Sequence, residues 1–280
     1  LARHVGVPNA RQGITHITLW GGFASTVFIP ITELLITTFE WRATLLCLGA
    51  VNLAYGLLYL NVIRPERDAS HAHTAEQKQA DSARDRQVVK QSLNSSLFWL
   101  ILGSLTVYAG MFSAFTFHMY PLLQEEGLSE RDVVLAIAII GPAQVLGRYL
   151  VTRYAPAMSM RLLGSLMVAV FPVAFALLIG ANPGFWLVAG VFAAYGMANG
   201  VFTIVRGFVV PEMLSPHAYG ALNGIITIAA TVARAAAPLA AAWLWAVEGS
   251  YGLVLWAIVA ASLLLAVGFW TAAWRTRPVL

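Results

Sequence analysis

Charged residues are scarce in this sequence. Asp, Glu, Lys and Arg make up 11% of its 280 residues, whereas about 25% is usual for a soluble domain. The mean hydropathy is +0.73, and 59% of the residues are hydrophobic. This balance excludes a soluble enzyme, a nucleic-acid-binding protein and a disordered adaptor, although the pI near 9.4 would suit nucleic acid in a soluble chain.

Metal-ligating side chains are also rare. Cys47 is the single cysteine and lies inside an apolar run, which excludes a disulfide framework and a cysteine-based metal site. His71 and His73 are two residues apart, but they lie in a polar loop where a pair of imidazoles rarely binds a metal. We therefore expect neither a metal site nor a cofactor.

Long apolar runs dominate the sequence instead. Each has the roughly 20 residues that a helix needs to cross about 30 Å of hydrocarbon. Helices satisfy their own backbone polar groups in lipid, and the runs lack the alternation of a barrel strand. We predict an all-α polytopic membrane bundle with eight transmembrane helices at residues 14–37, 43–63, 94–120, 132–153, 161–180, 184–207, 219–245 and 251–273.

Lys and Arg gather on one side of the predicted membrane. The opposite side holds only Arg42 and Arg131 of the 17 basic residues, and two more lie inside spans. Because basic loops stay in the cytoplasm, we expect a plasma (cytoplasmic) membrane protein with both termini of this chain and the loop 64–92 inside. The residues on the basic side are Arg3, Arg11, Arg64, Arg67, Lys78, Arg84, Arg86, Lys90, Arg153, Arg161, Arg206, Arg275 and Arg277.

One long polar segment, residues 64–92, divides two spans from six. Its composition cannot bury a core, which predicts a flexible cytoplasmic linker with some helix. Six spans preceded by a charged linker resemble the C-terminal half of a major facilitator superfamily transporter. The resemblance implies that residues 1–63 are the last two helices of the N-terminal bundle and that 93–280 form the C-terminal six-helix bundle. The first four helices would then be missing from a chain that begins at Leu1.

Local motifs carry the same resemblance. Glu40-Trp41-Arg42 is similar to the Gly-Trp-Arg that begins the sixth helix of the family, with Glu40 in place of Gly. Gly13, the pair Gly21-Gly22 and Pro30 resemble the fifth helix. The run 141–153 resembles the eighth helix and the loop after it.

Two arginines are similar to the cations of the monocarboxylate porter and oxalate–formate exchanger branch. Arg148 stands near the end of the eighth helix and Arg234 in the eleventh. The porters carry an Asp one turn before the first Arg, where this sequence has Gln144, and the exchanger has Lys in place of Arg234. The resemblance implies a secondary transporter of a small organic anion, a carboxylate, that works by alternating access with a proton or counter-anion as partner.

The residues themselves support an anion. A charge as deep as Arg234 costs about 2.5–3.5 kcal/mol on insertion scales, so it must face a partner or a water-filled cavity. Asn223 and Thr227 lie on the same helical face. A guanidinium binds a carboxylate through two hydrogen bonds. The alternative is a structural ion pair with an acid such as Glu33.

Arg148 has two interpretations as well. It lies about two turns from a span end, so it could reach the interface or bind substrate together with Gln144 on the same face. Acids inside the spans are nearly absent, so Arg148 and Arg234 together favour an anion. Tyr108 on the third span is a further candidate for lining the site.

A second polar stripe runs along the sixth span, through Tyr195, Asn199, Thr203 and Arg206. We predict that Asn199 binds substrate, and we assign Arg206 to membrane topology because it lies close to the cytoplasm. Small-residue pairs at 196 and 200 and at 220 and 224 predict close helix packing.

Two titratable residues are candidates for proton coupling. Glu33 is the one carboxylate clearly inside a span, and His118 lies near the outer end of the third. Alternatives to an anion transporter are a drug or sugar transporter of the same superfamily and an intramembrane enzyme. Neutral or cationic substrates would favour acids or amide clusters over two arginines, and no span pairs a nucleophile with a base. We therefore expect a transporter rather than an enzyme.

Overall fold

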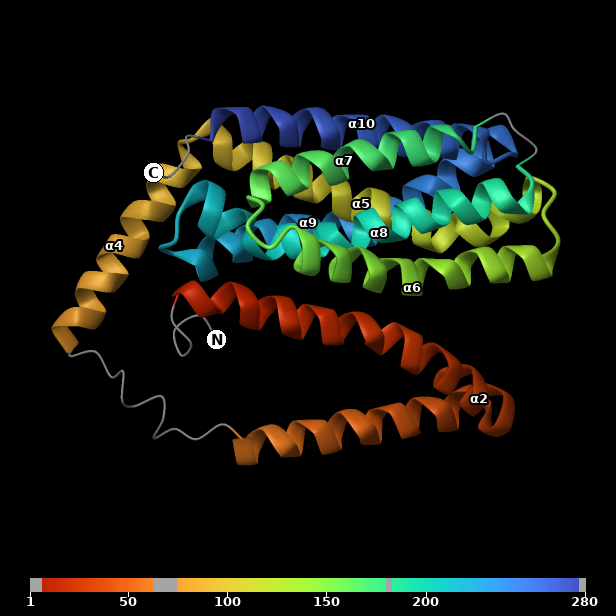
Figure 1. The fold of residues 1–280 in the computed structure, drawn as a ribbon, viewed down its shortest axis with the longest axis horizontal. Coiled ribbons are helices and arrows are strands. Elements are labelled where there is room, and N and C mark those ends of the chain that lie inside the picture. Colours follow the sequence, from red (N-terminus) through yellow and green to blue (C-terminus); the bar gives the residue numbers. More distant parts are fainter. Residues whose placement is uncertain (1–6, 63–74, 180–182, 277–280) are drawn as a thin grey trace. The chain divides into compact units, whose positions relative to one another are not determined.

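The structure, a computed structural model, describes residues 7–62, 75–179 and 183–276, and within these residues it contains helices and no strand (Figure 1). The chain divides into two compact units. One comprises Phe23–Asp85, and the other comprises Leu1–Gly22 with Arg86–Leu280. The predicted all-α class is confirmed.

Helix α2 (Val7–Val62) consists of two helices joined across Glu40. Glu40 has φ 64° and ψ 168°, a backbone region that is almost reserved for glycine. The break falls between the predicted spans 14–37 and 43–63, at the position where the resembled family has Gly. Within α2, residues Leu34–Tyr59 are long and apolar enough to cross a membrane.

Helix α4 (Ala75–Leu93) forms the second part of the predicted linker. The segment is rich in Ala, Gln, Lys and Arg, which are good helix formers. Val88 and Val89 near its end pack against the core of the bundle. The prediction allowed for some helix in this linker, and the structure has it at Ala75–Leu93. Residues 64–74, with His71 and His73, lie outside the described part of the chain.

Six further helices form the bundle. Serine side chains cap three of them, because Ser95, Ser129 and Ser159 each accept a hydrogen bond from a backbone N–H of the first turn. A π-helical turn, η1 (Val210–Leu214), extends the fourth. The helices are α5 (Ser96–Glu125), α6 (Glu130–Tyr154), α7 (Met160–Ala176), α8 (Phe185–Val209), α9 (Tyr219–Glu248) and α10 (Gly252–Arg275).

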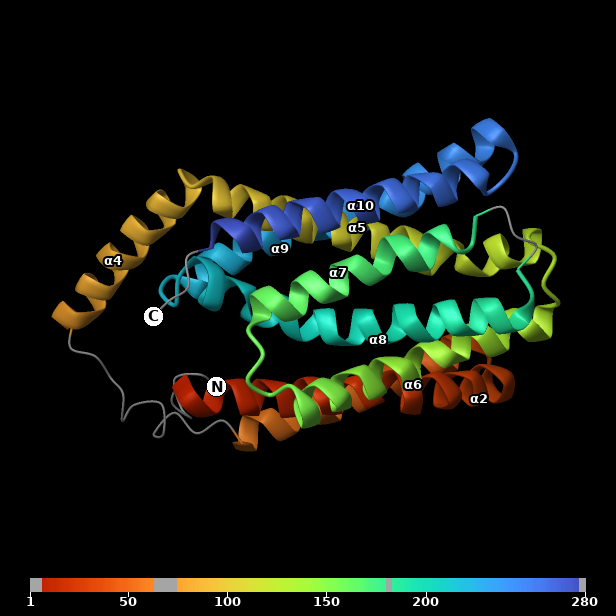
Figure 2. The same cartoon turned by 45° about the horizontal axis from the view of Figure 1, so that its top comes forward.

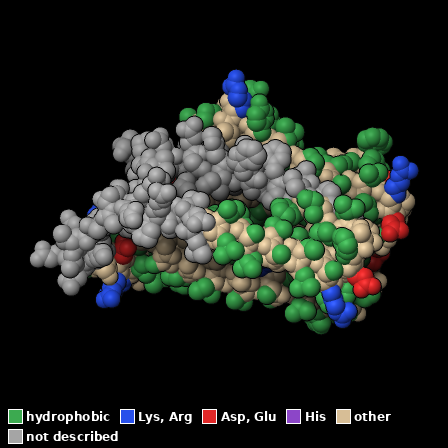
Figure 3. Space-filling view, turned by 90° about the horizontal axis from the view of Figure 1, so that it is seen from below, with side chains coloured by type: hydrophobic (Ala, Val, Ile, Leu, Met, Phe, Trp, Pro, Cys, Tyr) green, Lys and Arg blue, Asp and Glu red, His purple; other side chains and the backbone are tan. Residues whose placement is uncertain are grey.

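The surface of these helices suits lipid. Five of the six have the length and hydropathy of a membrane span, η1 being counted with α8. Helix α7 is apolar but has only 17 residues, because the chain turns at 177–179, inside the predicted span 161–180. On the face of the molecule shown in Figure 3, most of the coloured side chains are hydrophobic. Apolar side chains such as Leu239, 74% exposed, face outward.

The bundle is built from two related halves, α5–α7 and α8–α10. Helix α6 packs on α8, and α9 packs on α5; α7 also packs on α8, α10 packs on α5, and α7 and α10 pack on each other (Figure 2). This set of packed pairs stays the same when each helix is replaced by its counterpart in the other half, that is, α5 by α8, α6 by α9 and α7 by α10. Because each half has an odd number of helices, the halves run in opposite directions, as in an inverted repeat.

Aromatic side chains hold the two halves together. The ring centroid of Phe115 on α5 lies 4.8 Å from that of Phe175 on α7 and 5.0 Å from that of Tyr195 on α8. All three are buried. Lipid is as apolar as these rings, so their close van der Waals packing, rather than exclusion from water, stabilises the bundle. This cluster fixes α5 against α8, the two helices that flank the cavity described next.

Candidate functional site

A polar cavity of about 290 Å³ lies among α5, α8 and α9. Two of its lining residues, Arg206 and Arg234, are arginines on different helices, and none of the described lining residues is acidic. Both arginine side chains are exposed, so a solute that enters the cavity can reach them. The lining residues are Leu105, Ala109, Thr203, Arg206, Gly207, Tyr219, Asn223, Ile226, Thr227, Ala230, Thr231 and Arg234.

Helix α9 contributes the largest share of the wall. Asn223, Thr227, Thr231 and Arg234 follow one another at spacings of four, four and three residues and all line the cavity. Helical geometry places such residues on one face. The structure thus brings together three of the predicted site residues, Asn223, Thr227 and Arg234, and adds Thr231 to them.

The backbone around Arg234 is held from α5. Pro238 has no N–H, so it cannot donate to the carbonyl of Arg234 four residues earlier. The hydroxyl of Ser113 on α5 donates to that carbonyl instead, at 2.7 Å. A proline would otherwise leave a polar group unpaired within the membrane. The bond fixes the height of Arg234 along α5.

Tyr108 and Asn199 lie behind the cavity, because both are buried and neither is part of its lining. The Tyr108 hydroxyl on α5 donates to the side-chain oxygen of Asn199 on α8. The Arg206 guanidinium carbon lies 5.9 Å from the Tyr108 ring centroid, within reach of a cation–π interaction. Both residues were predicted to bind substrate; the structure places Tyr108 beneath the Arg206 guanidinium and Asn199 against the Tyr108 hydroxyl.

Arg148 and Gln144 occupy a different place. Arg148 is 5% exposed, and its Nε donates to the carbonyl of Gly200 on α8 at 3.0 Å. Its guanidinium also donates to Gln144 Oε1 at 3.4 Å. Neither side chain lines the cavity. Of the two predicted roles for Arg148, reaching the interface does not fit a side chain that is buried and bonded to the backbone of α8. Substrate binding by Arg148 stays a prediction.

Glycines bring α6 and α8 into backbone contact. A Cβ atom on Gly200 would lie 2.4 Å from the carbonyl oxygen of Gln144, and one on Gly196 would lie 2.8 Å from that of Ile140. The predicted packing role of this pair is confirmed. For the pair at 220 and 224, a Cβ would meet no described atom within 4 Å. The predicted packing role of that second pair is therefore wrong for the described part of the chain.

Of the two candidates for proton coupling, the structure describes the side chain of His118, which does not line the cavity. His118 Nε2 donates to the Pro238 carbonyl at 3.0 Å, and its Nδ1 is hydrogen-bonded to the Tyr251 hydroxyl at 3.1 Å. His118 thus joins α5 to α9 and to the start of α10. Glu33 belongs to α2, and its side chain lies outside the described residues.

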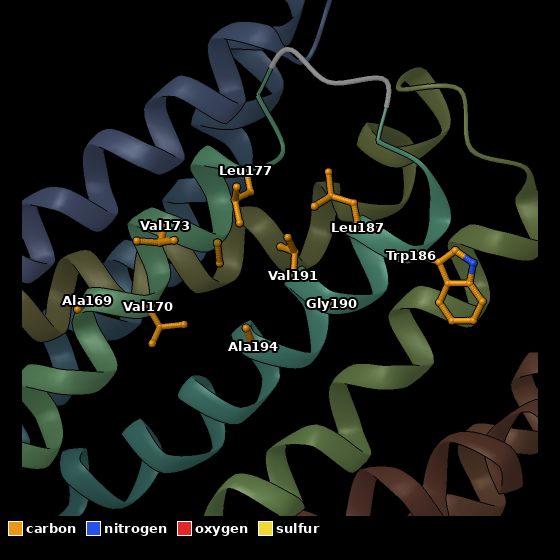
Figure 4. Close-up of a pocket in the computed structure, with 10 residues that line it drawn as sticks. Ala169, Val170, Val173, Leu177, Trp186, Leu187, Gly190, Val191 and Ala194 are labelled. Carbon is orange, nitrogen blue, oxygen red and sulfur yellow. The ribbon is translucent and has the colours of Figure 1, made fainter.

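A second pocket, of about 400 Å³, lies between α7 and α8 and is apolar. Val173 of α7, Leu177 directly after it, and Leu187 and Val191 of α8 line it (Figure 4). It offers no charged side chain to a polar ligand. Among the described residues there is also no group of three or more His, Cys, Asp or Glu side chains that could hold a metal ion.

The comparisons with known proteins establish the family. Residues 1–178 match the family model of the Major Facilitator Superfamily, which is more than half of the chain. The chain therefore belongs to this superfamily and is an integral membrane protein of a transporter family. No curated protein matches it. The family match ends between α7 and α8, so Arg148 lies within it, whereas Arg206 and Arg234 lie beyond it.

Sequence reasoning assigned Arg206 to membrane topology, but the structure places it in the cavity. One signal was present, because Asn199, Thr203 and Arg206 form a helical stripe. Periodicity shows that such residues share a face but not which neighbour that face meets. Tyr219 and Thr231 also line the cavity and had no distinguishing pattern of their own.

Proposed function

We propose that the protein is a secondary transporter of a small organic anion, in particular a carboxylate. The observation that carries this proposal is the cavity with two arginines and no acidic lining residue among those described. Guanidinium groups stay protonated and form paired hydrogen bonds with carboxylates. Cations without a counter-charge at membrane depth are costly, so an anion that neutralises them is favoured.

In this proposal Arg234 contacts the carboxylate, and Asn223 and Thr227 add hydrogen bonds on the same face of α9. Arg148 and Gln144 support the site by holding α6 against α8, because both are engaged with each other and with α8. The volume of about 290 Å³ is at the low end of the roughly 300–1,000 Å³ of drug-sized sites. The substrate is accordingly small.

Transport proceeds by alternating access, in which two helix bundles rock about the bound solute. The excess of Lys and Arg on one side supports a cytoplasmic location for that side, in the plasma membrane. Gln144 at the position of the porters' Asp supports exchange against a counter-anion over proton symport. His118 has both ring nitrogens engaged, which supports a structural role. Glu33 stays a predicted proton carrier.

A drug or sugar transporter is the competing proposal within the superfamily. Cationic drugs would be repelled by Arg206 and Arg234, and a neutral sugar would leave both charges uncompensated. An intramembrane enzyme would need a nucleophile beside a base, and the cavity lining contains neither His, Cys nor a carboxylate among its described residues.

The test is counterflow uptake by the intact protein in proteoliposomes, with labelled carboxylates, a sugar and a cationic dye. Loss of one charge-assisted contact costs about 1.5–3 kcal/mol. We therefore expect Arg234→Gln to lower carboxylate uptake by about 10- to 100-fold and Arg234→Lys to retain part of it. Arg153→Gln is the matched control, because Arg153 lies in the last turn of α6 and outside the cavity. Uptake of sugar or dye in place of carboxylates would overturn the proposal.

A further inference from the structure

Arg206 faces the same cavity as Arg234 from the neighbouring helix. It lies in the last turn of α8, where a basic residue ordinarily marks the cytoplasmic end of a span. Unlike such a residue, its side chain lines a cavity together with Thr203 and Gly207 of its own helix and with residues of α9. Topology alone does not require this placement.

The position of Arg206 is built by a second helix. Its guanidinium lies over the ring of Tyr108 on α5, and Tyr108 is 3% exposed. The Tyr108 hydroxyl donates to Asn199, whose backbone carbonyl accepts a bond from Thr203 at 2.9 Å. The hydrogen bond to Asn199 restrains the ring beneath the guanidinium.

Arg153 gives a direct comparison within the same bundle. It also lies in the last turn of a helix, with its guanidinium carbon 5.4 Å from an aromatic ring. That ring is Tyr154, the next residue of the same helix, and it is 72% exposed. Arg153 is thus a surface cation, whereas Arg206 is seated on a buried ring from another helix.

Two guanidinium groups in one small cavity repel each other. None of the described lining residues carries a negative charge to offset them. An anion with one carboxylate neutralises one of the two. An anion with a negative group at each end neutralises both and forms charge-assisted hydrogen bonds at both ends.

We propose that Arg206 is the second anion-contacting side chain of the cavity and makes it select anions with two separate negative groups, such as small dicarboxylates. This inference rests on the proposed function, since it assumes that the cavity carries anions. Arg234 binds one carboxylate and Arg206 binds the other. Asn223, which lines the cavity beside them, can hydrogen-bond the intervening part of the substrate.

The experiment compares uptake of matched mono- and dicarboxylates by the intact protein in proteoliposomes. The variants are Arg206→Gln, Arg206→Lys and the control Arg153→Gln. We expect Arg206→Gln to lower dicarboxylate uptake by about 10- to 100-fold while monocarboxylate uptake changes by less than about threefold. Arg206→Lys keeps the charge and should retain more dicarboxylate uptake than Arg206→Gln, and Arg153→Gln should leave both substrates unchanged.

The outcomes separate this inference from the proposed function. A wild-type protein that carries monocarboxylates as well as dicarboxylates, or an Arg206→Gln variant that lowers both equally, overturns the inference and leaves the anion transporter in place. A wild-type protein that takes up no carboxylate overturns both. A variant that fails to insert is recognised by its loss from the membrane fraction, and Arg206→Lys then provides the comparison.

Discussion

Helices α6 and α9 hold corresponding positions in the two halves of the bundle, yet their arginines differ. Each is the second helix of its half, and each packs on the first helix of the other half. Arg148 on α6 is buried and bonded to the Gly200 carbonyl. Arg234 on α9 is exposed within a cavity. Corresponding helices of the two halves thus carry a buried arginine bonded to a neighbouring backbone in one half and a cavity-lining arginine in the other.

Small residues account for the difference. Where α6 meets α8, a Cβ on Gly147 or Gly200 would lie within 2.7 Å of a backbone oxygen, so the two backbones are in contact and leave no space. Where α9 meets α5, a Cβ on Gly110 would lie at an ordinary 3.5 Å from Ala237. The looser contact leaves room for a cavity beside Arg234. Helix spacing decides what a membrane arginine can do.

The largest loss of stability is expected when a methyl group is added where α6 and α8 are in backbone contact. Gly200→Ala places Cβ 2.4 Å from the Gln144 carbonyl oxygen, so α6 and α8 must separate. We expect a loss of about 3 kcal/mol in unfolding free energy. Gly110→Ala, the matched change in the α5–α9 contact, should be neutral within about 1 kcal/mol. Unfolding of the purified protein in mixed micelles measures both, and equal losses would contradict the comparison.

Neutralising Arg148 should lower the stability of the protein, whereas neutralising Arg234 should leave the stability almost unchanged. Arg148→Gln loses a charge-assisted bond to a buried carbonyl, which costs about 1.5–3 kcal/mol in unfolding free energy. Arg234→Gln removes a side chain that points into a cavity and should change stability by less than about 0.5 kcal/mol. The same unfolding measurement applies, and a larger loss for Arg234→Gln would reverse the assignments.

A smaller effect should come from the bond that supports Arg234. Ser113→Ala leaves the Arg234 carbonyl without its donor, because Pro238 supplies none, and we expect a cost of about 1–2 kcal/mol. Ser104→Ala is the control, since that buried serine bonds only within α5, to the Leu100 carbonyl at 2.7 Å. If both variants unfold alike, Ser113 does not hold α9.

The smallest change in stability is expected for a substitution in the glycine pair of α9, Gly220 and Gly224. A Cβ on Gly224 meets no described atom within 4 Å, so Gly224→Ala should be neutral or raise stability by up to about 1 kcal/mol, because alanine favours the helix. A loss as large as that of Gly200→Ala would show that α9 packs on a further surface at this point.

Much of the fold was predictable because hydropathy and charge alone mark the spans. The polar stripe of α9 was predictable for a similar reason: Asn223, Thr227 and Arg234 share a helical face wherever that helix lies. The two glycine pairs have identical spacing, yet within the described part of the chain only Gly196 and Gly200 meet another backbone. Which face of a helix meets a neighbour depends on tertiary packing.

Tertiary packing also explains why the sequence did not predict the environments of Arg148 and Arg206. Arg148 and Arg206 were distinguished by depth in the sequence, which suggested that the deeper Arg148 binds substrate and the shallower Arg206 marks topology. In the structure the deeper one bonds to the backbone of α8, and the shallower one lines the cavity. Burial against a neighbouring helix, rather than depth along its own helix, separates the two.

Equilibrium binding tests the central claim most directly. The ligand is the labelled carboxylate with the fastest counterflow, and the proteins are the wild type, Arg234→Gln and Arg148→Gln, all measured at a temperature where each is folded. We predict that Arg234→Gln weakens binding by about 10- to 100-fold and that folded Arg148→Gln binds within about threefold of the wild type. Wild-type affinity in Arg234→Gln together with lost affinity in Arg148→Gln would contradict the account.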